Sequence, residues 1–419
     1  MKNYIKIQNK IKKFNKNINV SGDKSISIRC VLLASQAIGN TRIYNLLESE
    51  DVNNALNSIQ KLGVKYKKSK NFYEIAGLGL NSFNTNRNIE LNAGNSGTLA
   101  RLILGLLVNS KSFVTIKGDK SLSARDFSRI TEPLKLFGVE IKSKANKLPV
   151  KILGSNFLRP IKYEERLGSA QCKSAVMLAA LKTPGITKIK AKKSRNHTEL
   201  LFKSLNIPIK IVKKKYFDYI EIKGENNFNG FIYNVPGDIS SSSFFLVLTI
   251  LSENSNLTIK NVNINESRIG ILKILNKMNC KIKIKNRKMY KGESIGDLFV
   301  RSAKKINAIN CPKSLNSSAI DEFLIIFLVA AKAKGISIFK DLGELNKKES
   351  PRLDIAVKFL RMIGINVLRN KNDIKIFGNP KLKLDKKYLV NKFRKDHRVV
   401  MMSCIAALTL GGEWKITDA

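Results

Sequence analysis

Cysteine is scarce in this sequence and shows none of the spacings that mark a metal site or a disulfide framework. The five cysteines are Cys30, Cys172, Cys280, Cys311 and Cys404. They are odd in number and scattered, and no C-x-x-C pair occurs, which argues against both a structural zinc site and a disulfide scaffold. We therefore expect mostly small, buried, unpaired thiols in a reducing compartment.

Long hydrophobic runs are also missing. The longest are Phe323–Ala331 and Phe244–Ile250, far short of the roughly 18–20 residues that a membrane helix needs. The basic N-terminus has no apolar stretch of the kind found in signal peptides. These absences predict a cytoplasmic protein with no membrane association.

Acidic residues are few, 32 against 76 Lys and Arg, so the 419-residue chain carries a formal net charge of +44. Such a charge keeps nucleic-acid binding open as an alternative function. The excess positive charge comes mostly from Lys residues spread along the whole chain. This distribution indicates that Lys fills tolerant surface positions and does not form a single binding face. With only 7% aromatic residues, the chain is poorly suited to stacking on exposed bases.

What the sequence does contain is a repeat. An amphipathic stretch, then Gly or Asn, then a short alternating strand recurs five times at intervals of roughly 70–85 residues, longer than solenoid repeats. Gly or Asn directly after a helix is typical of a left-handed C-cap. The capping residues are Gly63, Gly138, Asn206, Asn279 and Gly364, and the strands are expected at 64–67, 139–142, 207–212, 281–285 and 365–368. The pattern predicts α/β subdomains in series.

Turns of small residues that open a helix beside a base form a second recurring feature. In 21–29, Lys24, Ser25 and Arg29 gather at a helix start, and 92–101 repeats the arrangement. Helix N-termini attract anions, and the bases add charge. Further segments of this kind are 118–125, 168–175 and 194–199.

Other segments suggest different roles. His197 is expected to be a structural hydrogen-bond partner rather than a catalyst. The Pro-Gly-Asp turn in 235–243 predicts a hinge or subdomain start. Asp321 opens a strongly apolar helix, a position where a carboxylate can become a general base. Acid–base–Arg clusters recur at 344–353 and 396–402.

Taken in order, nine motifs closely resemble the 3-phosphoshikimate 1-carboxyvinyltransferase (EPSP synthase) family. They are GDKSIS-x-R, GNSGT-x-x-R, GDxSLxxR, SAQxKSAVMLA, SRxHTE, VPGDISS, IDEF, KES-x-RL and DHRVVM. The resemblance implies an α/β (α+β) fold with two domains built from six βαβαββ subdomains. It places domain I at 1–20 plus 236–419 and domain II at 21–235. The last subdomain is expected to be truncated.

The resemblance implies transfer of the enolpyruvyl group from phosphoenolpyruvate to the 5-hydroxyl of shikimate 3-phosphate. The products are 5-enolpyruvylshikimate 3-phosphate and phosphate, on the route to chorismate and aromatic amino acids. No metal or organic cofactor and no specific nucleic acid is implied, and the family suggests a monomer. Both substrates are anionic, which suits the many bases at helix starts.

Site residues follow from the same resemblance. Asp321 would take the proton from the attacking hydroxyl, and Glu349 would exchange the proton at the methylene carbon with help from Lys24 or Lys348. Shikimate 3-phosphate would contact Lys24, Ser25, Arg29, Ser169, Ala170, Gln171, Arg195, Asp321 and Lys348. Phosphoenolpyruvate would contact Lys24, Gly97, Arg125, Gln171, Arg352 and Arg398. The small Gly97 further predicts that the inhibitor glyphosate fits.

The sequence departs from the family pattern at Ile28, Asp126, Asn196 and Pro351, where His, Pro, Asp and Asp are usual. Pro351 requires a position in the first turn of a helix. Family members also continue beyond the position of Ala419 through a segment that supplies a Lys to phosphoenolpyruvate. Three alternatives therefore stay open: an inactive, C-terminally truncated family member, the related UDP-sugar enzyme, and a basic nucleic-acid binder on this scaffold.

Overall fold

The computed structural model describes residues 4–391 and 396–417 and divides the chain into two compact units. Unit 2 contains residues 21–236 and 289–293, and unit 1 contains 1–20, 237–288 and 294–419. The chain therefore leaves unit 2 after Pro236, one residue later than the sequence boundary. The segment Met289–Glu293, expected in domain I, belongs to unit 2.

Unit 2 contains three four-stranded sheets of identical topology. Their strand orders are β14-β3-β5-β4, β6-β7-β9-β8 and β10-β11-β13-β12. In each, the first two strands are parallel and the other pairs are antiparallel. The strands are β3 (Ile38–Tyr44), β4 (Lys65–Lys68), β5 (Phe72–Leu78), β6 (Ile89–Asn92), β7 (Val114–Lys117), β8 (Glu140–Ser143), β9 (Val150–Leu153), β10 (Lys162–Glu165), β11 (Ile186–Lys192), β12 (Ile209–Lys213), β13 (Phe217–Lys223) and β14 (Ile232–Asn234).

The described residues of unit 1 also form three sheets, with orders β16-β17-β15-β2, β18-β20-β19 and β1-β22-β21. The last is made by strands from both ends of the chain, because β1 pairs antiparallel with β22. The strands are β1 (Tyr4–Ile7), β2 (Asn15–Asn19), β15 (Asn256–Asn263), β16 (Ile282–Tyr290), β17 (Glu293–Arg301), β18 (Gly335–Phe339), β19 (Val367–Asn370), β20 (Asp373–Gly378), β21 (Leu384–Val390) and β22 (Gly411–Thr417).

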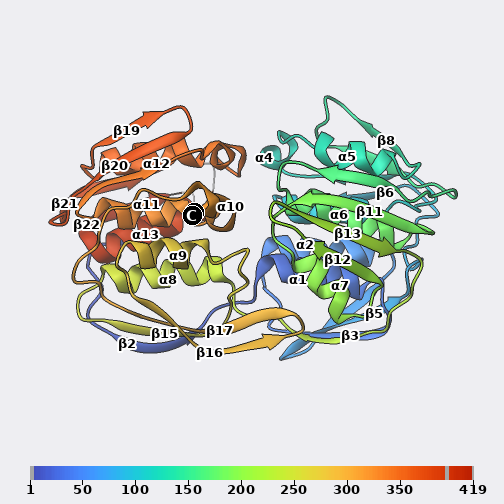
Figure 1. The fold of residues 1–419 in the computed structure, drawn as a ribbon, viewed down its shortest axis with the longest axis horizontal. Coiled ribbons are helices and arrows are strands. Elements are labelled where there is room, and N and C mark those ends of the chain that lie inside the picture. The colour runs from blue at the N-terminus through green and yellow to red at the C-terminus, as the bar shows by residue number, and fades with distance from the viewer. Residues whose placement is uncertain (1–3, 392–395, 418–419) are drawn as a thin grey trace. The chain divides into compact units, whose positions relative to one another are not determined.

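Helices form the centre of each unit, with the sheets around them (Figure 1). Unit 2 has α1 (Lys24–Ala34), α2 (Glu50–Lys61), α3 (Gly97–Leu106), α4 (Lys120–Ser123), α5 (Ser128–Lys135), α6 (Ala170–Leu181) and α7 (His197–Ser204). Unit 1 has α8 (Ile239–Leu251), α9 (Gly270–Lys277), α10 (Asn316–Ala319), α11 (Phe323–Ala331), α12 (Arg352–Met362) and α13 (His397–Leu410), with 3₁₀ turns η1 (Lys313–Leu315) and η2 (Gly343–Lys347). Every residue of α11 is buried, as its apolar sequence requires.

The repeat predicted from sequence is confirmed. Helices α2, α5, α7, α9 and α12 each end just before the predicted Gly or Asn, and a strand follows. All five capping residues have left-handed backbones: φ is 93° at Gly63, 102° at Gly138, 56° at Asn206, 67° at Asn279 and 80° at Gly364. The following strands β4, β8, β12, β16 and β19 overlap the predicted ranges. Local backbone chemistry thus sets where each of these helices ends.

The predictions about cysteines and apolar runs also have structural outcomes. Cys30, Cys172, Cys280 and Cys311 are buried free thiols and Cys404 is half-buried. Burial raises the pKa of Cys280 to about 12 and that of Cys311 to about 11, so these thiols stay protonated. Within the described ranges, no helix combines the length and the apolar character needed to cross a membrane.

Candidate active site

The first basic turn lies at the start of α1, as predicted. Asp23 is the N-cap, and its carboxylate accepts a hydrogen bond of 3.0 Å from the Ile26 amide. Lys24 is the first helical residue, and its amino group lies 2.9 Å from Asp51 Oδ2. Ser25 follows and is half-buried. A partly exposed amine therefore stands at the positive end of a helix dipole, an arrangement that favours an anion.

Arg29 lies one turn further along α1 and is buried. Its guanidinium donates to Thr198 Oγ1 at 2.8 Å, to Ser174 Oγ at 3.0 Å and to the Ser25 carbonyl at 2.9 Å. Burial lowers the pKa of Arg29 to about 10, although nearby carboxylates, Glu199 foremost, oppose this. A buried cation held mainly by neutral oxygens retains a strong attraction for an anionic ligand.

The second basic turn joins two helices through a side-chain network. Ser96 caps α3, and Gly97 is its first residue. Arg101 donates to Gln171 Oε1 at 2.7 Å, and Gln171 Nε2 donates to Thr98 Oγ1 at 2.9 Å. Gln171 is thereby fixed at the start of α6, which was not foreseen from sequence because the partners are 70 residues or more apart.

Gly97 leaves room for two guanidinium groups. A Cβ at this position would lie 2.8 Å from Arg101 Nη1 and 3.1 Å from Arg125 Nη1. Arg125 donates from Nη2 to Asn95 Oδ1 at 3.1 Å, while its Nε is buried without a hydrogen-bond acceptor in the described part of the chain. This donor of Arg125 is therefore available to an anionic ligand.

The third segment of unit 2 is the start of α6. Ser169 is the N-cap, and its hydroxyl accepts from the Cys172 amide at 3.3 Å. Ala170 and Gln171 form the first turn, and all three residues are half-buried. Arg195 lies in the loop before α7 and is also half-buried. Unit 2 therefore combines four helix starts, of α1, α3, α6 and α7, with the predicted binding residues on or beside them.

His197 is a structural hydrogen-bond partner in unit 2, as expected. Its Nδ1 lies 2.6 Å from Glu293 Oε1, and neither side chain is exposed. The next residue of α7, Thr198, accepts the hydrogen bond from Arg29 Nε.

In unit 1, the predicted acids and bases form one cluster before α11 and α12. Asp321 Oδ1 lies 3.3 Å from Lys348 Nζ and 3.7 Å from Arg352 Nη1. Glu349 Oε2 accepts from Arg352 Nη2. Pro351 is the N-cap of α12, a place that accepts proline because no amide hydrogen is needed there. The two predicted catalytic carboxylates are therefore joined through a single guanidinium.

Arg352 is 1% exposed, and three carboxylates surround it. Its Nε donates to Asp396 Oδ2 at 2.9 Å, and Ser350 Oγ donates to the same oxygen at 2.7 Å. Burial lowers the pKa of Arg352, but Glu349, Asp396 and Asp321 more than compensate and raise it above its ordinary value. Its Nη1 has no hydrogen-bond acceptor among the described residues, so this donor is available to an anionic ligand.

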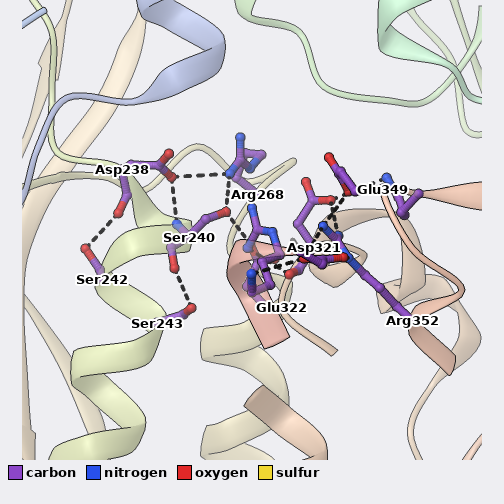
Figure 2. Close-up of polar contacts among 12 residues, drawn as sticks. Asp238, Ser240, Ser242, Ser243, Arg268, Asp321, Glu322, Glu349 and Arg352 are labelled. Atoms are coloured by element: carbon purple, nitrogen blue, oxygen red, sulfur yellow. Dashed lines mark hydrogen bonds and ion pairs between the residues drawn. The ribbon is translucent and has the colours of Figure 1, made fainter. Parts of the chain in front are cut away.

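Arg398 extends the cluster from the first turn of α13. Its Nη1 donates to the Asp321 carbonyl at 2.9 Å and lies 3.9 Å from Glu322 Oε1. Glu322 also accepts a hydrogen bond from Ser240 Oγ, which in turn accepts one from Arg268 Nη2 (Figure 2). Burial raises the pKa of Glu322, with Arg268 and Arg398 opposing.

Sequence reasoning singled out the segments that contain several supporting residues but gave these residues no role. Asp396 is fully buried, caps α13 through the Arg398 amide and holds Arg352. Its signal was present, because Asp before a long apolar helix is a strong N-cap pattern. The hydroxyls of Thr198 and Ser174 carried no such signal, since they reach Arg29 across 169 and 145 residues.

The predicted site residues thus fall into two sets, one in each unit. Unit 2 contains Lys24, Ser25, Gly97, Arg29, Arg125, Ser169, Ala170, Gln171 and Arg195, and unit 1 contains Asp321, Lys348, Glu349, Arg352 and Arg398. The first set is basic and polar, suited to binding anions. The second adds carboxylates, suited to moving protons.

Comparison with known proteins gives a consistent result. The model of the family described as EPSP synthase (3-phosphoshikimate 1-carboxyvinyltransferase) matches residues 8–419. A 3-phosphoshikimate 1-carboxyvinyltransferase from Petrotoga mobilis is 37% identical over 94% of this chain and 90% of its own length. One from Ruthia magnifica is 38% identical over 93% of this chain and 88% of its own length.

Solved structures agree. EPSP synthase from Acinetobacter baumannii superposes with a TM-score of 0.86 at 30% identity, covering 98% of this chain and 93% of that one. An enolpyruvyl transferase from Streptomyces tendae has a TM-score of 0.74 at 13% identity, over 99% of this chain and 92% of that one, and shares the fold. The predicted α/β enolpyruvyl transferase fold is confirmed, and the chain belongs to the EPSP synthase family.

Proposed function

We propose that this chain is a 3-phosphoshikimate 1-carboxyvinyltransferase of the shikimate pathway. It transfers the enolpyruvyl group of phosphoenolpyruvate to the 5-hydroxyl of shikimate 3-phosphate and releases phosphate. The observation that carries the proposal is the cluster in which Asp321, Arg352 and Glu349 are joined, with Lys348 3.3 Å from Asp321. A reaction that adds and then eliminates needs two acid–base groups beside cations that bind its anionic reactant.

Shikimate 3-phosphate is proposed to bind through the basic set of unit 2. Arg29 is fixed by hydroxyl and carbonyl oxygens, so its orientation is set before the ligand arrives and little rotamer entropy is lost. The helix starts of α1 and α6 supply backbone N–H groups to the phosphate. The residues proposed for this substrate are Lys24, Ser25, Arg29, Ser169, Ala170, Gln171, Arg195, Asp321 and Lys348.

Phosphoenolpyruvate is proposed to accept hydrogen bonds from buried N–H groups that have no acceptor among the described residues. Arg352 Nη1 and Arg125 Nε are buried donors lacking hydrogen-bond acceptors among the described residues. A carboxylate or phosphate would satisfy each by a charge-assisted bond. The residues proposed for this substrate are Lys24, Gly97, Arg125, Gln171, Arg352 and Arg398.

The chemistry is proposed to run through a tetrahedral intermediate. Asp321 removes the proton of the 5-hydroxyl as its oxygen attacks C2 of phosphoenolpyruvate, and Glu349 protonates the methylene carbon. In the second step Glu349 takes a proton back from that carbon while the C–O bond to phosphate breaks. Lys24 assists proton transfer, and the reaction requires no redox change. Positioning and electrostatics supply the rate enhancement.

We further propose that units 2 and 1 are the two domains of the family fold, expected at 21–235 and at 1–20 plus 236–419. The enzyme is proposed to act as a cytoplasmic monomer.

The test is phosphate release from phosphoenolpyruvate by purified, folded, full-length protein. Release must depend on shikimate 3-phosphate and must be lost in Asp321→Asn. The matched control is Asp354→Asn, which changes an acid of α12 that pairs with Arg369 and should leave the rate unchanged. A folded sample that releases no phosphate would contradict the proposal and favour an inactive family member.

A further inference from the structure

The tip of the β16–β17 hairpin contains a feature that the proposed reaction does not explain. The stem of the hairpin belongs to unit 1, where β17 pairs antiparallel with β15 from Asn256↔Arg301 to Asn263↔Ile295. Its tip, Met289–Glu293, belongs to unit 2. A five-residue tip that buries a carboxylate in the other unit requires a specific partner there, because an unpaired buried charge is costly.

The tip is anchored in unit 2 at two points. Tyr290 packs edge-on against Tyr233 with ring centroids 5.4 Å apart, and its hydroxyl accepts from the Asn234 amide at 2.8 Å. Glu293 is fully buried, and its Oε1 lies 2.6 Å from His197 Nδ1. The first anchor lies beside β14, and the second lies at the first residue of α7.

The first turn of α7 holds Arg29. Thr198 follows His197 directly, and its Oγ1 accepts from Arg29 Nε at 2.8 Å and shares a 2.7 Å hydrogen bond with Ser174. Ser174 Oγ in turn accepts from Arg29 Nη2 at 3.0 Å. The hydroxyls of Thr198 and Ser174 therefore orient two N–H groups of the Arg29 guanidinium. The position of Thr198 in turn depends on where α7 begins.

The same turn is fixed from its other side. Glu199 Oε1 lies 2.5 Å from Lys173 Nζ, and both side chains are buried. Thr198 thus lies between two residues that are each held by a buried, charged partner. The hydrogen bond of His197 is directional and the ion pair of Glu199 is buried, so together they restrain the first turn of the helix on both sides of Thr198.

We infer that Glu293 and His197 are positioning residues that set the first turn of α7, and through Thr198 the guanidinium of Arg29, for an anionic group of shikimate 3-phosphate. Both side chains are fully buried, so we assign them no direct contact with substrate. The identity of the ligand rests on the proposed function, whereas the positioning of Arg29 rests on the contacts described above.

The variants are chosen to separate positioning from folding. In the double variant His197→Leu/Glu293→Leu the buried polar pair becomes apolar, a replacement that commonly preserves folding. Glu293→Gln keeps an acceptor oxygen for His197 and serves as the conservative rescue. Tyr290→Phe removes the other anchor of the same hairpin tip and is the matched control.

The first measurement is calorimetric binding of shikimate 3-phosphate to the full-length protein. The double variant is expected to bind shikimate 3-phosphate about tenfold more weakly, because one well-oriented hydrogen bond to a charged group would be lost. Glu293→Gln and Tyr290→Phe should stay within about threefold of the unmodified protein. The KM for phosphoenolpyruvate should not change in any of them. Equal shikimate 3-phosphate affinity in the double variant and the unmodified protein would overturn the inference.

The second measurement does not depend on the substrate. The Nε–H of Arg29 is hydrogen-bonded to buried Thr198, so its ¹⁵N-detected exchange with water should be slow and should accelerate in the double variant only. If the unmodified protein does not bind shikimate 3-phosphate, the proposed function is wrong. The exchange rate of the Arg29 Nε–H then still tests whether Glu293 and His197 position Arg29. Unchanged Nε–H exchange in a folded double variant would overturn the positioning role.

Discussion

Units 1 and 2 each bury an arginine near a helix start, but in opposite electrostatic surroundings. Arg29 in unit 2 is held by two hydroxyls and a carbonyl, and burial lowers its pKa to about 10. Arg352 in unit 1 is surrounded by Asp396, Glu349 and Asp321, which raise its pKa. Neutral partners leave the charge of Arg29 for a ligand, whereas carboxylates around Arg352 can exchange protons. This difference supports the proposal that Arg29 of unit 2 mainly anchors an anionic ligand, whereas the carboxylates around Arg352 of unit 1 take part in proton transfer.

The largest effect should come from removing the proposed base. Asp321→Asn keeps the size of the side chain but cannot accept the hydroxyl proton, so kcat should fall by about 10²–10⁴-fold. The affinity for shikimate 3-phosphate should change far less, because Arg29 in unit 2 is untouched. Steady-state kinetics and calorimetry measure the two quantities separately. A loss of affinity as large as the loss of kcat would break the division between the units.

Stability should distinguish the two buried arginines. Arg352→Met leaves the fully buried Asp396 without its cation, so the free energy of unfolding should drop by about 3–5 kcal/mol. Arg29→Met deprives only neutral oxygens of their hydrogen-bond donor, and the drop should be about 1–3 kcal/mol. Urea denaturation compares them.

Arg361→Met on the same helix as Arg352 is the control, because Arg361 is exposed and bonds only the Val367 carbonyl in the contacts described. Its effect should stay within about 0.5 kcal/mol. Equal losses for Arg352→Met and Arg29→Met would show that the carboxylates do not distinguish the two sites.

A third prediction concerns a buried cation of unit 2 that lacks any carboxylate partner in the contacts described. Lys182 donates to Asn109 Oδ1 at 3.0 Å, and burial lowers its pKa from an ordinary value of 10.5 to about 7. Between these values the unfolded chain binds the proton and the folded protein does not. Stability should therefore rise with pH from about 7 to about 10.5, by up to about 1.4 kcal/mol per pH unit.

The reference for this effect is Lys182→Met, which removes the titrating group. The stability of the unmodified protein relative to this variant should increase as pH rises through that window in chemical denaturation. If the free energies of unfolding of the two proteins changed with pH in parallel, burial would not lower the pKa of Lys182.

The smallest effect is expected at Gly97. The Cβ of Gly97→Ala would lie within 3.1 Å of atoms of both Arg101 and Arg125, so these flexible side chains must shift. Glyphosate inhibition should weaken, with a smaller rise in the KM for phosphoenolpyruvate. Inhibition constants measured against phosphoenolpyruvate check this, and an unchanged constant would contradict the placement of Gly97 beside that substrate.

The features that could be predicted from the sequence are those that depend on residues adjacent in the chain. The five Gly or Asn C-caps, the strands after them and the helix starts beside Lys24 and Gly97 all follow from local backbone preferences. The contacts that orient the site do not. Asp396 reaches Arg352 across 44 residues and Glu293 reaches His197 across 96, and β1 pairs with β22 from opposite ends of the chain. Such pairings depend on tertiary packing, which no local pattern encodes.

The central claim is that this chain joins an enolpyruvyl group to shikimate 3-phosphate. Phosphorus NMR of one reaction mixture, containing the purified protein and both substrates, tests it directly. We expect the phosphoenolpyruvate and shikimate 3-phosphate signals to decline together, while the signals of inorganic phosphate and of the phosphate ester in 5-enolpyruvylshikimate 3-phosphate grow in equal amounts. Inorganic phosphate without the new ester, or no change with folded protein, would contradict it.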